Sequence, residues 1–454
     1  MNLNELKQKV VLILGAGKTG VATANFLIKE SKHVLLSESN STNNIRTLIN
    51  PNVEIEFGQN SDGFINKADL VVISPGISPL SNIVQKINSK KIPMVSDIEI
   101  AKLYMQKPII AVTGTNGKTT TTTLITHIIN SSGKKAISCG NIGKPLIELV
   151  TEKADYFVLE ISSFQIYYSP TLACDIAVCL NITPDHLDWH GNFEHYLQTK
   201  KNLFTQQDKD SWAVLNHNDK HIKEFEPRNN VFYFSSTKPD KNIFEQLENV
   251  AYYENSKLLI KQKDEISEIA HLNDLQIIGN HNIENALASI SVARIINIKS
   301  EAMKNGLKSF KGVEHRLEYV KNTNCKEFYN DSKATNPEAT IKAIEAFNDK
   351  KNRKITLILG GRDKNTDLNE MISAIKSQIS DVILYGEAKE RFKKELNRND
   401  YKKVKIVNNL PEAVTISSKS ESDIVLFSPA CSSFDMFKNY EERGKIFKEL
   451  VSKL

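Results

Sequence analysis

The sequence predicts an α/β protein of three domains, each built on a parallel sheet. Two observations carry this prediction. Short apolar runs suited to buried strands alternate with segments of helical spacing, and glycine-rich or polar loops follow many of those runs. The length of 454 residues also suits about three domains of ordinary size. We expect the domains to cover residues 1–96, 97–312 and 313–454.

The composition is that of an ordinary globular protein, with 40% hydrophobic and 25% charged residues. The formal charge of +5 is small for this length and the lysines are dispersed, so no nucleic-acid partner is expected. The five cysteines are odd in number and form no Cys-x-x-Cys pair, which argues against a disulfide framework or zinc site and fits a reducing cytoplasm. No signal peptide or membrane-spanning run is seen, so we expect a cytoplasmic protein without a membrane partner.

The first domain opens with a predicted strand, Lys9–Leu14, and a glycine loop, Gly15–Gly20, that begins a helix ending near Lys29. A second strand, His33–Leu36, leads into Glu38. A Gly-x-Gly-x-x-Gly loop with an acid about twenty residues later is typical of a Rossmann-like domain that binds a dinucleotide. The same loop would also suit the diphosphate of another nucleotide.

A further predicted strand in this domain, Leu70–Ile73, ends in the loop Ser74–Ser78. In parallel sheets, loops at the carboxyl ends of strands bind ligands. Ordinary turn chemistry also explains a Pro-Gly pair. The first domain is therefore predicted only to bind a nucleotide.

The central domain begins with the stretch Pro108–Thr123, in which an apolar strand, Ile109–Val112, feeds a glycine loop that opens a helix. The glycines allow a tight turn whose N–H groups face one anion, Lys118 adds a charge for phosphates, and the Thr119 hydroxyl can ligate Mg²⁺. The common motif has another glycine where Val112 stands. The alternative is a plain turn with a surface lysine, but the strand and helix around it favour a P-loop ATPase-type sheet that binds a nucleoside triphosphate.

Two later strands of the central domain end in polar residues. The strand Asp155–Leu159 ends at Glu160, and the strand Ile176–Leu180 runs into a segment that ends in His186. Because carboxyl ends of parallel strands share one edge, these groups would meet near the phosphate loop, where carboxylate and imidazole could hold Mg²⁺ beside phosphates. A structural role for each is the alternative.

The rest of the central domain carries less chemistry. A predicted helix, Phe193–Phe204, contains a tyrosine and two lysines, and is alternatively a solvated basic helix. Residues 206–274 are polar and lysine-rich, with short predicted strands. A helix from residue 279 to Ile296 carries Asn282 and Asn285, which could hydrogen-bond a base or ribose or cap the helix.

The C-terminal domain repeats the alternation of strand and helix after a boundary near Gly312, and is predicted to be Rossmann-like. Its predicted strands are Lys354–Leu359, Asp381–Tyr385 and Ile424–Phe427. Its loops with ionic and hydroxyl groups are Asn330–Pro337, Gly360–Lys364 and Ser428–Asp435.

Taken in order, these motifs resemble the Mur ligase family over all three domains. The resemblance runs from Gly15–Gly20 to Phe437–Gly444, and the shortened phosphate loop fits this family. The other segments that carry the resemblance are Glu160–Gln165, Asn181–His186, Tyr196–Lys200 and His281–Asn285.

Two further segments, Asp331–Asn336 and Ser428–Asp435, resemble the branch of the family that adds D-glutamate. The Asp-x-x-Arg-type signature of the diamino-acid-adding relative is not seen. The resemblance implies an ATP-dependent amide ligase of peptidoglycan synthesis, which acts as a monomer and joins D-glutamate to UDP-N-acetylmuramoyl-L-alanine through an acyl phosphate. A sibling enzyme that adds another amino acid is the alternative within the family.

Two interpretations outside the family compete with this one. A nicotinamide oxidoreductase would use the first glycine loop but leave the second phosphate loop and the His186 segment unexplained. A nucleotide-gated switch would use Lys118 to sense ATP but leave Lys333, Lys364 and Ser433 without a role.

The resemblance also implies roles for individual residues. Lys118, His186 and Lys200 would be catalytic. Two Mg²⁺ ions would be held, one by Thr119 and Glu160 and the other by His186 and a carbamylated Lys200. The ATP contacts implied are Gly114, Thr115, Asn116, Gly117, Lys118, Thr119, Thr120, Asn285, Arg316 and Asp331.

The substrate contacts implied by the resemblance fall into two groups. Those for the UDP-sugar are Lys18, Thr19, Ser74, Gly76, Asn141, Ser162 and Gln165, with Ser37 and Glu38 where the family binds uridine. Those for D-glutamate are Lys333, Thr335, Lys364, Ser433 and Phe434.

Overall fold

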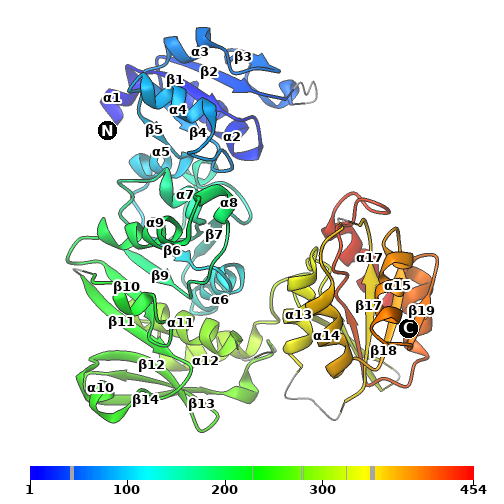
Figure 1. The fold of residues 1–454 in the computed structure, drawn as a ribbon. Coiled ribbons are helices and arrows are strands. Elements are labelled where there is room, and N and C mark those ends of the chain that lie inside the picture. Colours follow the sequence, from blue (N-terminus) through cyan, green and yellow to red (C-terminus); the bar gives the residue numbers. More distant parts are fainter. Residues whose placement is uncertain are drawn as a thin grey trace. The chain divides into compact units, whose positions relative to one another are not determined.

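The computed structural model describes residues 1–40, 45–227, 229–277, 279, 281–323, 325–347, 353–363 and 365–454. The chain forms two compact units, one of residues 1–274 and 283–307 and the other of residues 275–282 and 308–454. Three sheets lie within them, two in the first unit and one in the second (Figure 1). The predicted α/β class is confirmed, whereas the domain limits at residues 96 and 312 stay predictions.

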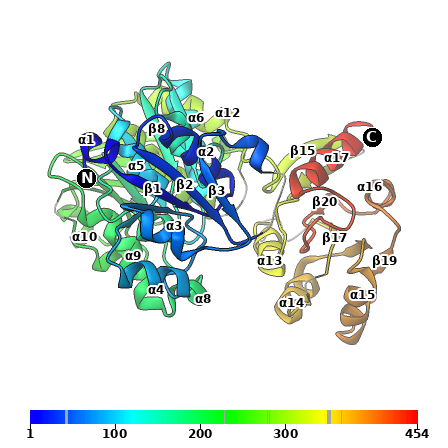
Figure 2. The same cartoon turned by 90° about the horizontal axis from the view of Figure 1, so that it is seen from above.

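The N-terminal sheet has five parallel strands in the order β3-β2-β1-β4-β5, and β1, β2 and β3 lie side by side in Figure 2. Its central strands are continuous apolar runs, as expected of strands covered by helices on both faces. The strands are β1 (Val10–Leu14), β2 (His33–Glu38), β3 (Glu54–Phe57), β4 (Leu70–Ile73) and β5 (Met94–Val95). The helices are α1 (Leu3–Lys7), α2 (Lys18–Leu27), α3 (Asp62–Lys67), α4 (Asn82–Ser89) and α5 (Asp97–Tyr104).

The central sheet has nine strands in the order β14-β13-β12-β11-β10-β9-β6-β8-β7. The strands are β6 (Ile109–Thr113), β7 (Ala136–Gly140), β8 (Tyr156–Glu160), β9 (Ile176–Cys179), β10 (Trp212–Asn216), β11 (Asn230–Ser235), β12 (Asn249–Glu254), β13 (Lys257–Gln262) and β14 (Glu265–His271). The pairs from β7 to β12 are parallel, as predicted.

The last three strands of this sheet, β12 to β14, pair antiparallel instead (Figure 1). The turn between β12 and β13 consists of Asn255 and Ser256, both with left-handed φ angles of 50° and 61°. Two such residues form the turn that best joins adjacent antiparallel strands, so the chain reverses here without a crossover helix.

The helices of the central region are α6 (Lys118–Ser131), α7 (Ser163–Tyr167), α8 (Leu187–His190), α9 (Phe193–Thr205), α10 (Lys241–Gln246), α11 (His281–Ile295) and α12 (Ser300–Ser309). The strand register matters most for the site. Val112 of β6 lies opposite Glu160 of β8, and Thr113 lies opposite Cys179 of β9. The loops that leave these three parallel strands therefore start at one edge of the sheet.

The C-terminal sheet has the strand order β15-β16-β20-β17-β18-β19, with only β15 antiparallel among its described strands. The strands are β15 (Glu318–Thr323), β16 (Lys326–Asn330), β17 (Ile355–Gly360), β18 (Asp381–Tyr385), β19 (Val404–Ile406) and β20 (Ile424–Phe427). The helices are α13 (Pro337–Glu345), α14 (Asn369–Gln378), α15 (Lys389–Arg398), α16 (Leu410–Ser418) and α17 (Tyr440–Ser452).

Helices cover both faces of the C-terminal sheet. α13, α14 and α15 pack on one face, and α16 and α17 pack on the other, each side forming its own apolar core (Figure 2). Loops at the carboxyl ends of the strands are left to bind ligands. Within the described residues, no helix combines the length and apolarity needed to cross a bilayer.

Candidate active site around the phosphate loop

The phosphate loop, Gly114–Thr119, leaves β6 and opens α6. Gly114 and Gly117 have φ angles of 147° and 83°, which side chains rarely adopt. A Cβ on Gly117 would lie 2.4 Å from Oδ1 of Asn285, so only glycine fits beside that buried amide. The loop thus brings backbone N–H groups and a helix N-terminus to one place, as phosphate binding requires.

The loop that follows β9 holds the phosphate loop in shape. The Thr115 amide donates to the Asn181 carbonyl (2.9 Å), and the Asn116 amide donates to Oδ1 of Asn181 (2.8 Å). The Asn181 side chain donates back to the Asn116 carbonyl (3.2 Å). No role was predicted for Asn181 from the sequence. The signal that could have indicated one is its position directly after a buried strand, because that strand neighbours β6.

Two lysine side chains reach the turn at the end of β6. Lys118 Nζ donates to the carbonyl oxygens of Gly114 and Thr115, both at 2.8 Å. Lys200 Nζ donates to the Gly114 carbonyl at 3.0 Å and to Oγ1 of Thr113 at 3.3 Å. The two ammonium groups therefore share one acceptor beside the place where phosphates would bind.

Lys200 is deeply buried, with 1% of its surface exposed, so the alternative of a solvated basic helix is wrong at this position. Its Nζ lies 4.8 Å from the centre of the Tyr196 ring, and the Tyr196 hydroxyl lies 2.9 Å from Oγ1 of Thr115. Burial, and then the nearby Lys118 charge, lower the pKa of Lys200 to about 7. A substantial fraction of Lys200 is consequently an uncharged amine at neutral pH.

Glu160, at the end of β8, has an unsatisfied buried oxygen. Its Oε1 accepts from the Asn141 side chain at 2.8 Å, whereas Oε2 has no hydrogen-bond partner among the described residues. The side chain is 2% exposed, and Thr119 at the start of α6 is 8% exposed. A buried carboxylate oxygen without a donor is costly, so a Mg²⁺ ion near the phosphate loop fits these residues.

His186 lies in the same loop as Asn181, further along the chain. Its backbone is left-handed (φ 52°), its ring is 4.7 Å from the Phe164 ring, and its Nε2 is 3.4 Å from Oδ2 of Asp185. The side chain is about half exposed. Over the described ranges, no three or more His, Cys, Asp or Glu side chains are grouped to hold a metal ion.

A histidine without a predicted role, His190, ties this loop to α7. Its Nε2 lies 3.0 Å from Oγ of Ser163, and its Nδ1 lies 3.0 Å from Nδ1 of His195. Burial, and then the neighbouring His195, lower the pKa of His190 to about 4, so the ring is neutral at pH 7. In the adjoining turn, Ser162 and Gln165 cap α7 by bonding each other. The sequence signal that could have pointed to His190 is its His-x-x-x-His spacing from His186.

In the N-terminal sheet, the predicted UDP-sugar residues lie on two neighbouring loops. A Cβ on Gly15, after β1, would come within 2.8 Å of Cβ of Ser74, after β4. Lys18 Nζ donates to the Gly143 carbonyl at 2.6 Å, two residues beyond Asn141. Thr19 stands beside Lys18 in the first turn of α2, and Gly76 has open space where a Cβ would lie.

Glu38 closes this N-terminal loop region. Its carboxylate accepts from the Ala16 amide at 2.8 Å and from the Asn40 amide at 2.9 Å. Burial opposes ionisation, but these hydrogen bonds outweigh it and lower the pKa of Glu38. Ser37, beside it, is buried and donates within the sheet instead. Glu38 is thus an ionised group fixed on the glycine loop.

In the second unit, Asp331 follows β16 and is 7% exposed. It accepts from Oγ of Ser428 at 2.7 Å and from the Leu317 amide at 3.2 Å. Burial outweighs these hydrogen bonds and raises the pKa of Asp331 to about 7. Arg316 lies between His315 and Leu317, whose φ angles of 65° and 41° mark a strained turn.

The predicted D-glutamate residues of this unit lie on loops at the carboxyl edge of its sheet. Lys333 Nζ lies 5.3 Å from the centre of the Tyr440 ring, and Thr335 is partly buried nearby in sequence. Ser433 is 2% exposed, whereas the Phe434 side chain next to it is 60% exposed. Lys364 lies outside the described residues.

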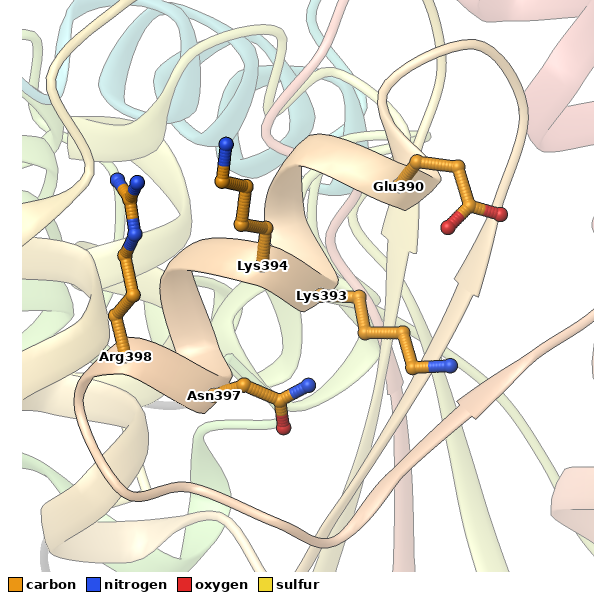
Figure 3. Close-up of a pocket in the computed structure, with 5 residues that line it drawn as sticks. All are labelled: Glu390, Lys393, Lys394, Asn397 and Arg398. Carbon is orange, nitrogen blue, oxygen red and sulfur yellow. The ribbon is translucent and has the colours of Figure 1, made fainter.

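Three surface hollows formed by described residues include none of these groups. One of about 540 Å³ lies on α15, where charged side chains fan out from the helix (Figure 3). Its lining residues are Glu390, Lys393, Lys394, Asn397 and Arg398. Two others, of about 650 and 950 Å³, lie where strands of the central and C-terminal sheets begin. None of the residues lining these three hollows belongs to the predicted site.

Family models match most of the chain. The Mur ligase MurD-like N-terminal domain matches residues 9–96, the Mur ligase middle domain matches residues 112–293, and the Mur ligase glutamate ligase domain matches residues 315–431. Among solved structures, the MurC ligase of Thermotoga maritima has a TM-score of 0.59 at 18% identity, covering 98% of this chain and 100% of that one. The MurF ligase of the same organism, solved with ADP, has a TM-score of 0.59 at 16% identity, with coverages of 100% and 97%.

Relatives of known name are similar from end to end. The UDP-N-acetylmuramoylalanine–D-glutamate ligase of Thermoanaerobacter pseudethanolicus is 39% identical over 462 residues, covering 99% of each chain. The enzyme of the same name from Caldicellulosiruptor bescii is 39% identical over 469 residues, again covering 99% of each. Because the likeness extends over nearly the whole chain, this chain belongs to the Mur ligase family.

Proposed function

We propose that this chain joins D-glutamate to UDP-N-acetylmuramoyl-L-alanine with hydrolysis of ATP to ADP and phosphate, as a step of peptidoglycan synthesis. Relatives that bear the name of this ligase are 34–39% identical to the chain over nearly its whole length. The observation on the molecule itself that carries the proposal is the arrangement at the phosphate loop. There, three groups lie at one edge of the sheet: the ammonium of Lys118, the buried amine of Lys200, and the buried Oε2 of Glu160, which lacks a hydrogen-bond donor.

The reaction divides into two displacements. A carboxylate oxygen of the L-alanyl group attacks the γ-phosphorus of ATP, and the bond from that phosphorus to the β-phosphate oxygen breaks, which releases ADP. The nitrogen of D-glutamate then attacks the acyl carbon, loses a proton and displaces inorganic phosphate. Both steps bring anions together, so positioning and charge neutralisation dominate the barrier.

Lys118 would neutralise the transferred phosphate. In the structure its ammonium is held by two carbonyls of the phosphate loop, so it is placed before ATP arrives. The N–H groups of Gly117, Thr119 and Thr120 at the start of α6 would bind the phosphate oxygens. Because these donors are fixed by the fold, they need not reorganise when charge shifts to the leaving group.

Thr119 and Glu160 would hold a Mg²⁺ ion on the phosphates, and His186 would hold a second one near the substrate carboxylate. When bound, these ions would neutralise phosphate charge and polarise the phosphorus–oxygen bond. The free Oε2 of Glu160 supports the first of these sites. His186, which is half exposed, can turn toward a substrate-borne carboxylate without disturbing the core.

Lys200 would carry a carbamate. An amine reacts with CO₂ only when it is uncharged, and the lowered pKa of Lys200 makes that form available near neutral pH. The modification would replace a buried cation beside Lys118 with an anion. The resulting pair would remove the repulsion between the two ammonium groups and give His186 an anionic neighbour for the second metal.

The two glycine-loop regions of the N-terminal sheet would hold the UDP part of the sugar nucleotide through Lys18, Thr19, Ser74 and Gly76. Asn141, Ser162 and Gln165 would place the muramoyl group.

Asn285, Arg316 and Asp331 would contact the base and ribose of ATP. For D-glutamate, Lys333, Thr335, Lys364, Ser433 and Phe434 would supply cations and hydroxyls for its two carboxylates. We also propose that the chain acts in the cytoplasm as a monomer.

The test is phosphate release from ATP with Mg²⁺ and UDP-N-acetylmuramoyl-L-alanine, comparing D-glutamate with L-glutamate, L-alanine, L-lysine and meso-diaminopimelate. Release that needs D-glutamate and is lost in Lys118→Ala supports the proposal. Release with another amino acid would support the ligase chemistry but contradict D-glutamate as the acceptor, and the chain would then be a sibling ligase. No release with any amino acid, although ATP binds, would point to a nucleotide switch.

A further inference from the structure

Arg443, in the first turn of α17, is the largest fully buried side chain among the described residues, with 0% exposed. Its guanidinium donates from Nε to Oγ of Ser332 (3.0 Å) and from Nη2 to the Ser332 carbonyl (2.7 Å). Its Nη1 donates to the Cys431 carbonyl at 2.9 Å. Over the described ranges, no carboxylate forms an ion pair with it. A buried charge whose hydrogen bonds all go to neutral acceptors is costly, which points to a use beyond packing.

The three hydrogen bonds join two loops that are distant in sequence. Ser332 belongs to the loop after β16 and Cys431 to the loop after β20, and these two strands are parallel neighbours. A Cβ on Gly361, in the loop after β17, would lie 3.1 Å from Nη1 of Arg443. One side chain therefore lies among the loops at the carboxyl ends of three adjacent strands.

The start of α17 also fixes the surroundings of Lys333. Ser332 Oγ donates to the Tyr440 carbonyl at 2.8 Å, and Lys333 Nζ lies over the Tyr440 ring. The Lys333 amide donates to the His315 carbonyl at 3.1 Å. A Cβ on Gly444 would come within 2.2 Å of Nδ1 of His315, so the glycine after Arg443 leaves room for that histidine.

We propose that Arg443 is a positioning residue for the acceptor amino acid, holding the backbones that carry Lys333 and Ser433 at a fixed separation. This inference rests on the proposed function, in which those two residues grip the carboxylates of D-glutamate. An acceptor with two carboxylates must be held from both loops at once. A shift of about 1 Å between the loops would move one of the two carboxylates away from its partner, so D-glutamate would bind more weakly, by up to about a hundredfold.

Lysine cannot replace arginine here. The guanidinium presents donors in a rigid planar fork, which reaches Ser332 through two of its nitrogens and Cys431 through a third. An ammonium carries its three donors on one atom, so it does not reproduce the planar fork that spans both loops. Arg443→Lys would thus keep the charge and lose the link between the loops.

The experiment measures kcat, the KM for each substrate and the melting temperature of the wild type, Arg443→Lys and Ser332→Ala. Arg353→Lys is the matched control, because Arg353 links Glu327 (2.9 Å) to the Asp423 carbonyl (3.1 Å) at the start of the same two strands, at the opposite edge of the sheet. We expect Arg443→Lys to raise the KM for D-glutamate about ten- to a hundredfold while leaving the KM for the UDP-sugar unchanged. Ser332→Ala should raise it less, and Arg353→Lys should lower the melting temperature only.

An unchanged KM for D-glutamate in both Arg443→Lys and Ser332→Ala would overturn the inference, as would an equal rise in Arg353→Lys. If Arg443→Lys does not fold, Ser332→Ala decides, since it removes a single acceptor. The wild-type arm separates this inference from the proposed function. Turnover with another amino acid overturns only the acceptor, and the KM is then measured for that amino acid. An inactive wild type overturns both.

Discussion

Lys118 and Lys200 donate to the same carbonyl oxygen, that of Gly114, over 2.8 and 3.0 Å. Burial, and then the charge of Lys118 beside it, lower the pKa of Lys200 to about 7. The first unit thus places one lysine on the phosphate loop and, next to it, a buried amine whose uncharged form is available near neutral pH. The predictions below separate these roles.

Lys118→Met is expected to reduce kcat/KM by about a hundred- to a thousandfold, because a fixed cation aimed at developing charge is lost. The melting temperature should change little, since the ammonium bonds carbonyls of its own loop. The control is Lys134→Met, which removes a lysine that bonds the Ile296 carbonyl at 3.0 Å. That variant should lose stability and keep its activity. Equal activity losses in the two variants would contradict the assignment of Lys118.

Lys200→Met is expected to flatten the dependence of stability on pH. In bicarbonate-free buffer the folded state loses the Lys200 proton near pH 7, whereas the unfolded chain keeps it up to its ordinary pKa of 10.5. Wild-type stability should therefore rise with pH between these values, by at most about 1.4 kcal/mol per pH unit. Melting curves across this range would measure the slope. A Lys200→Met slope equal to that of Lys134→Met would show that Lys200 is not the group responsible.

Glu160→Gln is expected to abolish most activity without lowering the melting temperature. The amide removes the buried charge that now lacks a donor at Oε2, but it is a poor ligand for Mg²⁺. Half-maximal activity should need more Mg²⁺. The matched control is Glu99→Gln, in a buried carboxylate whose two oxygens accept from the amide and hydroxyl of Thr171. It should cost about 1–3 kcal/mol of stability and spare activity. A destabilised Glu160→Gln would argue that Glu160 is structural.

His190→Asn is expected to reduce the sensitivity of the fold to acid. The folded-state pKa of His190 is lowered to about 4 from an ordinary 6.5, so the unfolded state binds an extra proton between those values. Wild-type stability should fall as the pH drops from 6.5 toward 4, by at most about 1.4 kcal/mol per unit. Unfolding by urea at several pH values measures this. A His190→Asn slope equal to that of the wild type would show that another group is responsible.

Much of the fold followed from local pattern. The strands Leu70–Ile73, Asp381–Tyr385 and Ile424–Phe427 have the predicted limits, because each is an apolar run bounded by polar or turn residues and buried along its length. The hairpin strands β13 and β14 were not predicted. The apolar run of β13 is only three residues long, Leu258–Ile260, and β14 exposes charged residues such as Glu265 and Glu268, so only the turn at Asn255 hints at the reversal.

The candidate site was also predictable from the sequence only in part. Lys118 and Glu160 were predictable because strand ends in a parallel sheet converge, which sequence order alone implies. Three features depend on which segments of the chain pack together. They are the hydrogen bonds of Asn181 to the phosphate loop, the burial of Lys200 against Tyr196 and the burial of Arg443. Single residues of ordinary type carry no local trace of such contacts, so only the three-dimensional arrangement reveals them.

The outer strand β14 affects how copies of this chain behave when they are crowded together. An edge strand offers backbone groups on which a second sheet can grow. Here Glu265, Glu268 and His271 place ionisable side chains along that edge, and a register shift between Leu258 and Leu259 interrupts the regular ladder beneath it. Charge and irregularity both oppose edge-to-edge joining. The charged side chains of β14 and the register shift beside it therefore oppose aggregation of the nine-stranded sheet through this edge.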